Sequence, residues 1–286
     1  MWSATVSLES PYNFEQVLQR LSIDPLNIID INEQLVKVPI RLNNEQDVVT
    51  IKATGTFEKP AFQLSGTMNT AEAEERIREI FGWNVQMEQM LTHFRSTSLR
   101  PLSERYAYTP IVLDFDPFAS LARCIIHQQL NLKFAFTLTQ RFYTTFGTSM
   151  DGVWFPPSPE RVANISVSEL RELQFSQRKA EYVIGLAEKI VDGTINIGEL
   201  RHLSNEEIEK KLLPLRGIGP WTVQNFLLFG LGRKNLFPKA DIGLQRAIQQ
   251  LFKLETKPTD EFMEQLKNEW EPYGSYASLY LWRSIE

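Results

Sequence analysis

The chain has 286 residues, of which 43% are hydrophobic and 23% are charged. This composition is typical of a folded globular protein and argues against disorder, and the length suffices for two or three packed units. The single cysteine, Cys124, excludes an internal disulfide and cannot ligate an iron–sulfur cluster, so we expect no such cluster. The net charge of −5, from 30 basic and 35 acidic residues, argues against a protein that coats nucleic acid with its whole surface.

Neither secretion nor membrane insertion is expected from the sequence. The first residues, Met1-Trp2-Ser3-Ala4, contain no basic segment followed by an apolar run. The apolar run from Phe226 to Phe229 is far too short to span a bilayer. A reducing cytoplasm is therefore the expected location.

The first third of the chain predicts an α+β unit over residues 1–95. Apolar and polar residues alternate in short runs, which is typical of half-buried strands, at residues 5–8, 36–38, 48–51 and 62–64. Three segments instead have helical spacing, at residues 14–21, 71–81 and 85–94.

Beyond a connecting stretch at residues 97–110, helical patterns predominate, so residues 96–286 are predicted to be helical. Helix starts are indicated by Asp116 before Pro117, by the capping box Ser204-x-x-Glu207, and by Thr259. The stretch 152–159, which contains proline and glycine, predicts a loop. Six basic residues and one acid, Asp241, lie between Lys211 and Arg246, which makes this segment the electrostatic candidate for a DNA contact.

Two motifs within this segment carry chemistry. Gly217-Ile218-Gly219 forms a tight turn between helical patterns, and its amides could hold a phosphate. Taken alone, the two glycines favour a plain helical corner over a phosphate site. Asp241 follows in Pro238-Lys239-Ala240-Asp241 and precedes a helical pattern, so by itself it is first of all a good N-cap.

Together, the turn and the aspartate resemble the helix-hairpin-helix (HhH-GPD) DNA glycosylase superfamily, and in particular its bacterial 3-methyladenine DNA glycosylase II branch. The resemblance extends upstream through residues 116–118, 123–130 and 175–180, and covers roughly residues 112–286. It implies a mainly α fold with an N-terminal α+β (TBP-like) unit. The helical region is then expected to form two subdomains with the active-site cleft between them.

The resemblance also implies a role for each site residue. Asp241 would be the catalytic carboxylate that stabilises an oxocarbenium-like sugar. The other implied sites are a base pocket at Trp221 and Trp282, a DNA wedge at Gln129 with Gln128 beside it, a phosphate-binding hairpin at Gly217, Ile218 and Gly219, and Na⁺ or K⁺ bound by the carbonyls of Leu213, Leu215 and Ile218. The wedge is commonly apolar in the family, and Asn225 stands where relatives place an aromatic residue.

The family's bifunctional members carry a Schiff-base lysine two residues after the second glycine of the hairpin, and here that position is Trp221. The implied enzyme is therefore a monofunctional DNA glycosylase of base excision repair that leaves an abasic site. Alkylated purines such as 3-methyladenine and 7-methylguanine are the expected substrates. They are cationic, so an aromatic pocket attracts them, and they are good leaving groups, so one carboxylate suffices for hydrolysis.

Two alternatives stay open at this point. A noncatalytic helix-hairpin-helix DNA-binding protein would keep the hairpin without needing Asp241 or an aromatic pocket. A glycosylase for another lesion class is the second alternative. For the implied enzyme the expected partner is double-stranded DNA with a damaged base, bound by a monomer that is cytoplasmic in a bacterium and nucleoid-associated during repair.

Overall fold

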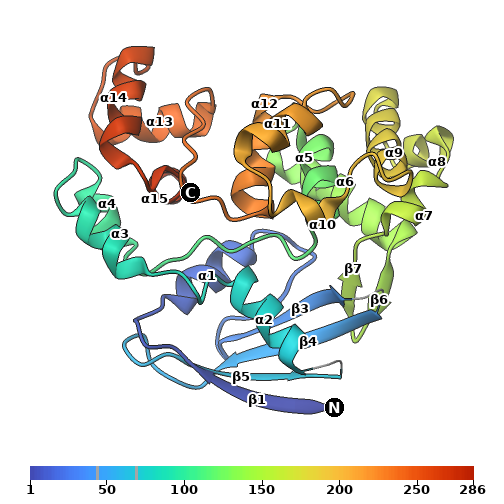
Figure 1. Ribbon diagram of the computed structural model, residues 1–286, viewed down its shortest axis with the longest axis horizontal. Coiled ribbons are helices and arrows are strands. Elements are labelled where there is room, and N and C mark those ends of the chain that lie inside the picture. Colours follow the sequence, from blue (N-terminus) through green and yellow to red (C-terminus); the bar gives the residue numbers. More distant parts are fainter. Residues whose placement is uncertain (43–44, 68–69) are drawn as a thin grey trace.

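The N-terminal unit is a five-stranded antiparallel sheet with two helices on one face (Figure 1). The computed structural model describes residues 1–42, 45–67 and 70–286. The sheet has the order β1-β5-β4-β3-β2. Its strands are β1 (Trp2–Ser7), β2 (Ile28–Asp30), β3 (Leu35–Leu42), β4 (Glu45–Ala53) and β5 (Ala61–Gly66), and the helices are α1 (Phe14–Leu21) and α2 (Thr70–Ile80).

The alternation in the sequence explains this packing. Val36, Val38 and Ile40 of β3 are buried, whereas their neighbours along the strand are partly exposed. Since alternate side chains of a strand point to opposite faces, these three join Leu18 of α1 and Ile77 of α2 in one core. The predicted strands and helices of this unit are confirmed. β2 was not predicted, because three residues are too few to show a period.

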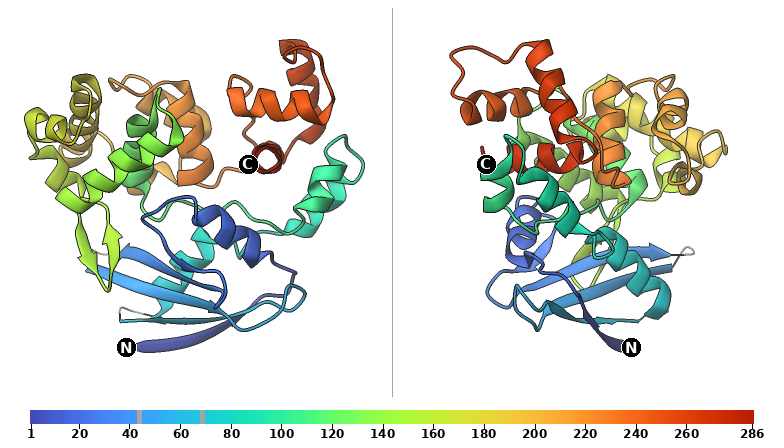
Figure 2. Two further views of the ribbon diagram at one scale, coloured as in Figure 1. Left: turned by 180° about the vertical axis from the view of Figure 1, so that it is seen from behind. Right: turned by 60° about the vertical axis from the view of Figure 1, so that its left-hand side comes forward.

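The helices form two lobes above the sheet, visible side by side in Figure 1 and in the left view of Figure 2. The first lobe contains α5 (Pro117–His127), α6 (Leu132–Phe146), α7 (Pro159–Ala163), α8 (Val167–Glu172), α9 (Gln177–Val191), α10 (Ile197–Leu200), α11 (Asn205–Leu212) and α12 (Pro220–Asn225). The second lobe contains α3 (Met87–Phe94), α4 (Arg100–Arg105), α13 (Ile242–Leu251), α14 (Asp260–Trp270) and α15 (Gly274–Arg283). The mainly α fold with an N-terminal α+β unit is thus confirmed.

A short π-helical segment, η1 (Phe226–Gly230), runs directly on from α12 and contributes to both lobes. Phe226 and Leu227 pack in the core of the first lobe, whereas Leu228 packs in the core of the second. The segment therefore fixes the two lobes relative to each other.

The hydrophobic cores divide near residue 85, whereas the sequence predicts a boundary at residue 95. The core of the sheet ends at Trp83, and α3 buries Met90 and Phe94 in the second lobe. A helical period shows that α3 has an apolar face but not which core receives it. Local order also exceeds the prediction, since α4 lies within the expected connecting stretch and β7 (Val153–Phe155) within the expected loop at 152–159.

The predicted helix starts are confirmed. Asp116 begins α5 by accepting a hydrogen bond from the amide of Ala119 at 2.9 Å. Ser204 and Glu207 form the capping box of α11, and Thr259 caps α14.

A hairpin of β6 (Thr148–Met150) and β7 connects the first lobe to the sheet, as Figure 1 and the left view of Figure 2 show. Phe155 of β7 packs with Val48 of β4, and Thr148 donates a hydrogen bond to Gln46. None of the helices in the described part of the chain combines the length and apolar character needed to cross a bilayer.

The core under α1 allows a direct test of this packing. Leu18→Ala is expected to lower the free energy of unfolding by about 2–5 kcal/mol, because it leaves a cavity at a fully buried site. Glu15→Ala, on the exposed face of the same helix, should change the free energy of unfolding by only about 0.5 kcal/mol. Chemical denaturation measures both, and equal effects would contradict the assigned core.

Candidate active site

Asp241 stands at the start of α13 with its carboxylate held from two sides. Oδ1 accepts a hydrogen bond from the amide of Leu244 at 2.8 Å and another from Nε1 of Trp282 at 3.0 Å. Among the described residues, no donor contacts Oδ2. The N-cap predicted from the sequence is therefore present, and it leaves Oδ2 available to a bound ligand.

An aromatic stack lies beside this carboxylate. Trp282 of α15 packs on Phe229 of η1, with ring centroids 5.9 Å apart and an interplanar angle of 34°. The guanidinium of Arg20, from α1, lies 5.4 Å from the centroid of the Phe229 ring and pairs with Glu286 at 2.6 Å. Three segments far apart in the sequence thus meet at the site.

Gly243 permits the close approach of Trp282 to Asp241. A Cβ at this position would lie 3.1 Å from Oδ1 of Asp241 and 3.4 Å from Cδ1 of Trp282. Sequence reasoning missed Gly243 and Phe229. A glycine in the first turn of a helix is a poor helix former and was the available signal for Gly243. The sequence contains no such signal for Phe229, because the apolar run around it is typical of a buried core segment.

Trp221, which is predicted to line the base pocket together with Trp282, lies on a different helix from Trp282. It lies in the first turn of α12 with 40% of its surface exposed, and among the described residues it pairs with no other aromatic ring. Asn225 donates a hydrogen bond from its side chain to the carbonyl of Trp221 at 2.9 Å. The aromatic partner of Trp282 is Phe229, about one turn after Asn225.

The two glycines of the hairpin between α11 and α12 have different structural roles. Gly217 has φ +86°, and a Cβ there would lie 2.3 Å from the ring of Tyr182. Gly219 has φ −109° and begins α12 without a side-chain cap, and a Cβ there would meet nothing within 4 Å. Gly217 is thus required by the turn, whereas Gly219 leaves open space in front of a helix N-terminus, where an anion binds favourably.

The loop between α5 and α6 separates the two glutamines predicted as the wedge. Gln129 is exposed at the tip with φ +56°. Gln128 instead turns inward, and its Nε2 donates to the carbonyl of Gly217 at 2.9 Å and to Oγ1 of Thr222 at 3.0 Å. Gln128, which is predicted to lie beside the wedge, thus holds the loop against the hairpin with its side-chain amide.

The carbonyls predicted to hold a monovalent cation lie on the same turn. The carbonyl of Leu215 accepts a hydrogen bond from the amide of Ile218 at 3.1 Å. The side chain of Leu213 is exposed. In the described ranges, no three or more histidine, cysteine, aspartate or glutamate side chains are grouped so that they could hold a metal ion. A donor set of carbonyl oxygens alone fits a hard ion such as Na⁺ or K⁺ better than a transition metal.

A groove beside the stack separates α1 from the first lobe. Its walls include Arg20, Asp24, Asp114, Arg123, His127, Leu132, Phe136, Phe229 and Glu286. Burial is the main cause that lowers the pKa of His127 to about 3, so the ring is neutral at physiological pH, and it contacts Oγ1 of Thr139 at 2.9 Å. The groove thus combines the rings of Phe136 and Phe229 and the neutral His127 with charged side chains, and it meets the site of Asp241 at Phe229.

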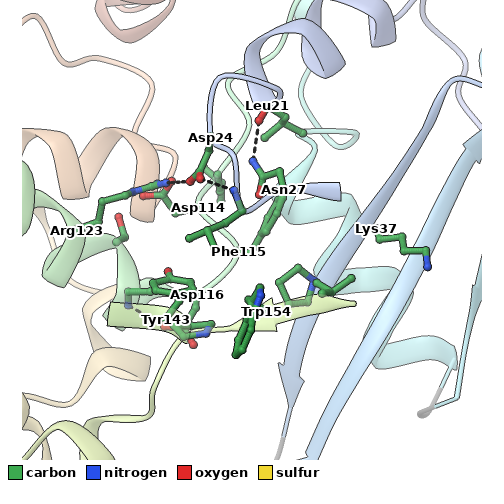
Figure 3. Close-up of a pocket in the computed structure, with 17 residues that line it drawn as sticks. Leu21, Asp24, Asn27, Lys37, Asp114, Phe115, Asp116, Arg123, Tyr143 and Trp154 are labelled. Carbon is green, nitrogen blue, oxygen red and sulfur yellow. Dashed lines mark hydrogen bonds and ion pairs between the residues drawn. The ribbon is translucent and has the colours of Figure 1, made fainter. Parts of the chain in front are cut away.

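A cavity of about 70 Å³, which shares Asp24, Asp114 and Arg123 with this groove, lies where the sheet meets the first lobe (Figure 3). Arg123 pairs with Asp24 at 3.3 Å and with Asp114, and Arg41 pairs with Asp116 at 3.5 Å. The predicted site residues do not line this cavity, and these pairs between the N-terminal unit and the helices indicate a structural junction.

Comparison with known proteins agrees with the resemblance seen in the sequence. The family model described as HhH-GPD superfamily base excision DNA repair protein matches residues 122–272. The Bacillus subtilis protein YfjP is 52% identical over the full length of both chains. A DNA-3-methyladenine glycosylase of the same organism is 32% identical over 90% of this chain and 85% of its own.

The solved structure of a 3-methyladenine DNA glycosylase from Archaeoglobus fulgidus has the same fold, with a TM-score of 0.86 and 24% identity over 99% of this chain and 97% of its own. The family match covers more than half of the chain and includes the hairpin and Asp241. The chain therefore belongs to the HhH-GPD superfamily of base excision DNA repair proteins, as its sequence resemblance predicts.

Proposed function

We propose that this protein is a monofunctional DNA glycosylase that hydrolyses the N-glycosidic bond of alkylated purines in duplex DNA and leaves an abasic site. The observation that carries the proposal is the carboxylate of Asp241, with Oδ1 fixed by two donors and Oδ2 contacted by no donor within the described part of the chain. A fixed negative charge stabilises the positive charge that develops on the sugar, and the free oxygen can orient the attacking water.

The surroundings of Asp241 favour a cationic base. Trp282 presents aromatic surface beside the carboxylate, next to the Phe229 ring over which Arg20 lies, and the adjoining groove adds Phe136 and the neutral His127. The face of an aromatic ring attracts a cation, so 3-methyladenine and 7-methylguanine suit this site. Such bases are good leaving groups and need little protonation by a general acid, which agrees with a site that has one carboxylate.

The lysine nearest in sequence to Asp241 is poorly suited to attack the sugar. Nζ of Lys239 lies 2.5 Å from Glu264, and this hydrogen bond is the main cause that raises the pKa of Lys239. A protonated amine is not a nucleophile, and Trp221 occupies the position of the family's Schiff-base lysine. Both features support hydrolysis without strand cleavage.

The hairpin is proposed to bind one DNA phosphate near Gly219 without reading sequence. A Na⁺ or K⁺ ion on the carbonyls of Leu213, Leu215 and Ile218 would add positive charge at the same turn. We further propose that the protein acts as a monomer and that Gln129, at the exposed loop tip, fills the space vacated by the extruded base.

Asp241→Asn tests the proposed chemistry. The amide oxygen can still accept the bonds from Leu244 and Trp282, so stability should persist, whereas base release should fall roughly hundredfold or more because the charge is lost. Release of methylated purines from alkylated duplex DNA is the measurement. Asp116→Asn, at the N-cap of α5, is the matched control, and near wild-type release by Asp241→Asn would leave Asp241 with a capping role only.

Borohydride trapping tests the monofunctional assignment. With Lys239 paired to Glu264, no covalent enzyme–DNA adduct is expected, and strand breaks should appear only after alkali or an added abasic-site nuclease. Denaturing electrophoresis measures both products. An adduct that forms at neutral pH and disappears in Lys239→Gln would overturn the assignment.

The two hairpin glycines should respond differently to substitution. Gly219→Leu has room for its side chain, so the fold should persist while affinity for damaged and undamaged duplexes falls roughly tenfold by loss of a phosphate contact. Gly217→Ala should instead lower the free energy of unfolding by about 1–2 kcal/mol or more through its left-handed backbone. Binding titrations and chemical denaturation separate the effects. A loss confined to damaged DNA for Gly219→Leu would be inconsistent with a phosphate contact.

A further inference from the structure

The loop of residues 128–131, here called the wedge loop, is held from two sides by side chains for which sequence reasoning gave no such role. We propose that Lys179 and Gln128 are positioning residues that keep the wedge loop in the shape needed to enter the DNA stack. Their contacts fix the loop relative to the phosphate-binding hairpin. This inference rests on the proposed function and deepens it.

Lys179 binds the C-terminal end of α5. Its Nζ donates to the carbonyls of Ile125, Ile126 and Gln128 at 3.0, 2.7 and 2.6 Å. The last carbonyls of a helix have no partner within the helix and carry partial negative charge, so an ammonium group there satisfies several at once. Lys179 forms no ion pair with a carboxylate among the described residues, so these carbonyls are its main partners.

The ammonium of Lys179 is partly shielded from water, which strengthens its hydrogen bonds to the three carbonyls. Desolvation lowers the pKa of Lys179 to about 8, because the half-buried ammonium has lost part of its hydration. Hydrogen bonds that involve a charged donor are stronger than neutral ones, and a lower local dielectric strengthens them further. Lys179 therefore restrains the backbone at the point where α5 ends and the wedge loop begins.

Gln128 holds the same loop from the other side. Its amide reaches across to the carbonyl of Gly217 in the hairpin and to the buried hydroxyl of Thr222 in α12. The next residue, Gln129, has a left-handed backbone that a residue with a side chain rarely adopts. Such a conformation persists only when its surroundings impose it, and Lys179 and Gln128 supply those contacts.

The arrangement couples two steps on DNA. A phosphate bound at the hairpin sets the position of the duplex, and Gln128 sets the distance from the hairpin to the wedge loop. A loose loop would still allow binding, but it would fill the vacated space in the stack less often. The penalty should be greatest for a damaged base that is still paired, because its extrusion costs most.

Lys179→Met tests the inference, because it keeps the length of the side chain and removes the charge. Two duplexes are compared, with 7-methylguanine opposite cytosine and with 7-methylguanine opposite an abasic site. For the paired lesion, kcat/KM is expected to fall roughly tenfold or more, as loss of a charged hydrogen bond implies. The unpaired lesion should be released at nearly the wild-type rate.

Two further variants separate positioning from general stability. Lys189→Met, on the exposed part of the same helix, should behave as wild type on both duplexes. Lys179→Arg, which keeps the charge, should recover much of the loss. Equal losses on both duplexes for Lys179→Met, or an unchanged rate on the paired lesion, would overturn the inference.

A readout that needs no catalysis distinguishes this inference from the proposed function. The fluorescence of 2-aminopurine beside a stable abasic-site analogue reports whether the wedge disturbs the stack when the protein binds. Lys179→Met and Gln128→Ala should each reduce the wild-type fluorescence change, and Lys189→Met should not. If wild-type protein releases no methylated base, the proposed function fails, whereas an unchanged fluorescence response in both variants refutes the positioning role.

Discussion

The hydrogen bond from the indole of Trp282 to Oδ1 of Asp241 connects the chemistry of this protein to its fold. It joins the beginning of α13 to the end of α15, and Gly243 leaves room for it, because a Cβ there would crowd both partners at 3.1–3.4 Å. With Leu244 it occupies one carboxylate oxygen and leaves the other free. Trp282 also packs on Phe229, so one ring orients the carboxylate and forms part of the surface against which a base would lie.

The N-terminal unit contributes to this site as well as to stability. Arg20 of α1 stands over Phe229, and Arg123 of α5 pairs with Asp24 just after α1. The β6–β7 hairpin adds a second attachment to the sheet. A unit with no recognisable motif therefore supplies one wall of the groove, and its ion pairs are partly shielded from water, where they are screened less than exposed pairs.

The features that follow from local rules could be predicted from the sequence. Helix starts at Asp116 and Asp241 follow from capping, and the strands follow from alternation, because these signals lie within a few neighbouring residues. The partner of Trp282 could not be predicted, because Phe229 reaches it through a π-helical turn that an apolar run does not reveal. The inward turn of Gln128 and the contacts of Lys179 were hidden for the same reason, since both depend on residues distant in sequence.

The π-helical turn has a consequence for how such a pocket could change. A π turn holds about one more residue than an α turn, so deleting one residue within η1 would turn the segment back into an α turn and shift its side chains locally, without rotating the rest of the chain. A different side chain would then face Trp282, while Asp241 could keep its hydrogen bonds through α13 and α15. The proposed base-binding surface can therefore change through η1 while α13 and α15 keep the proposed catalytic carboxylate in place.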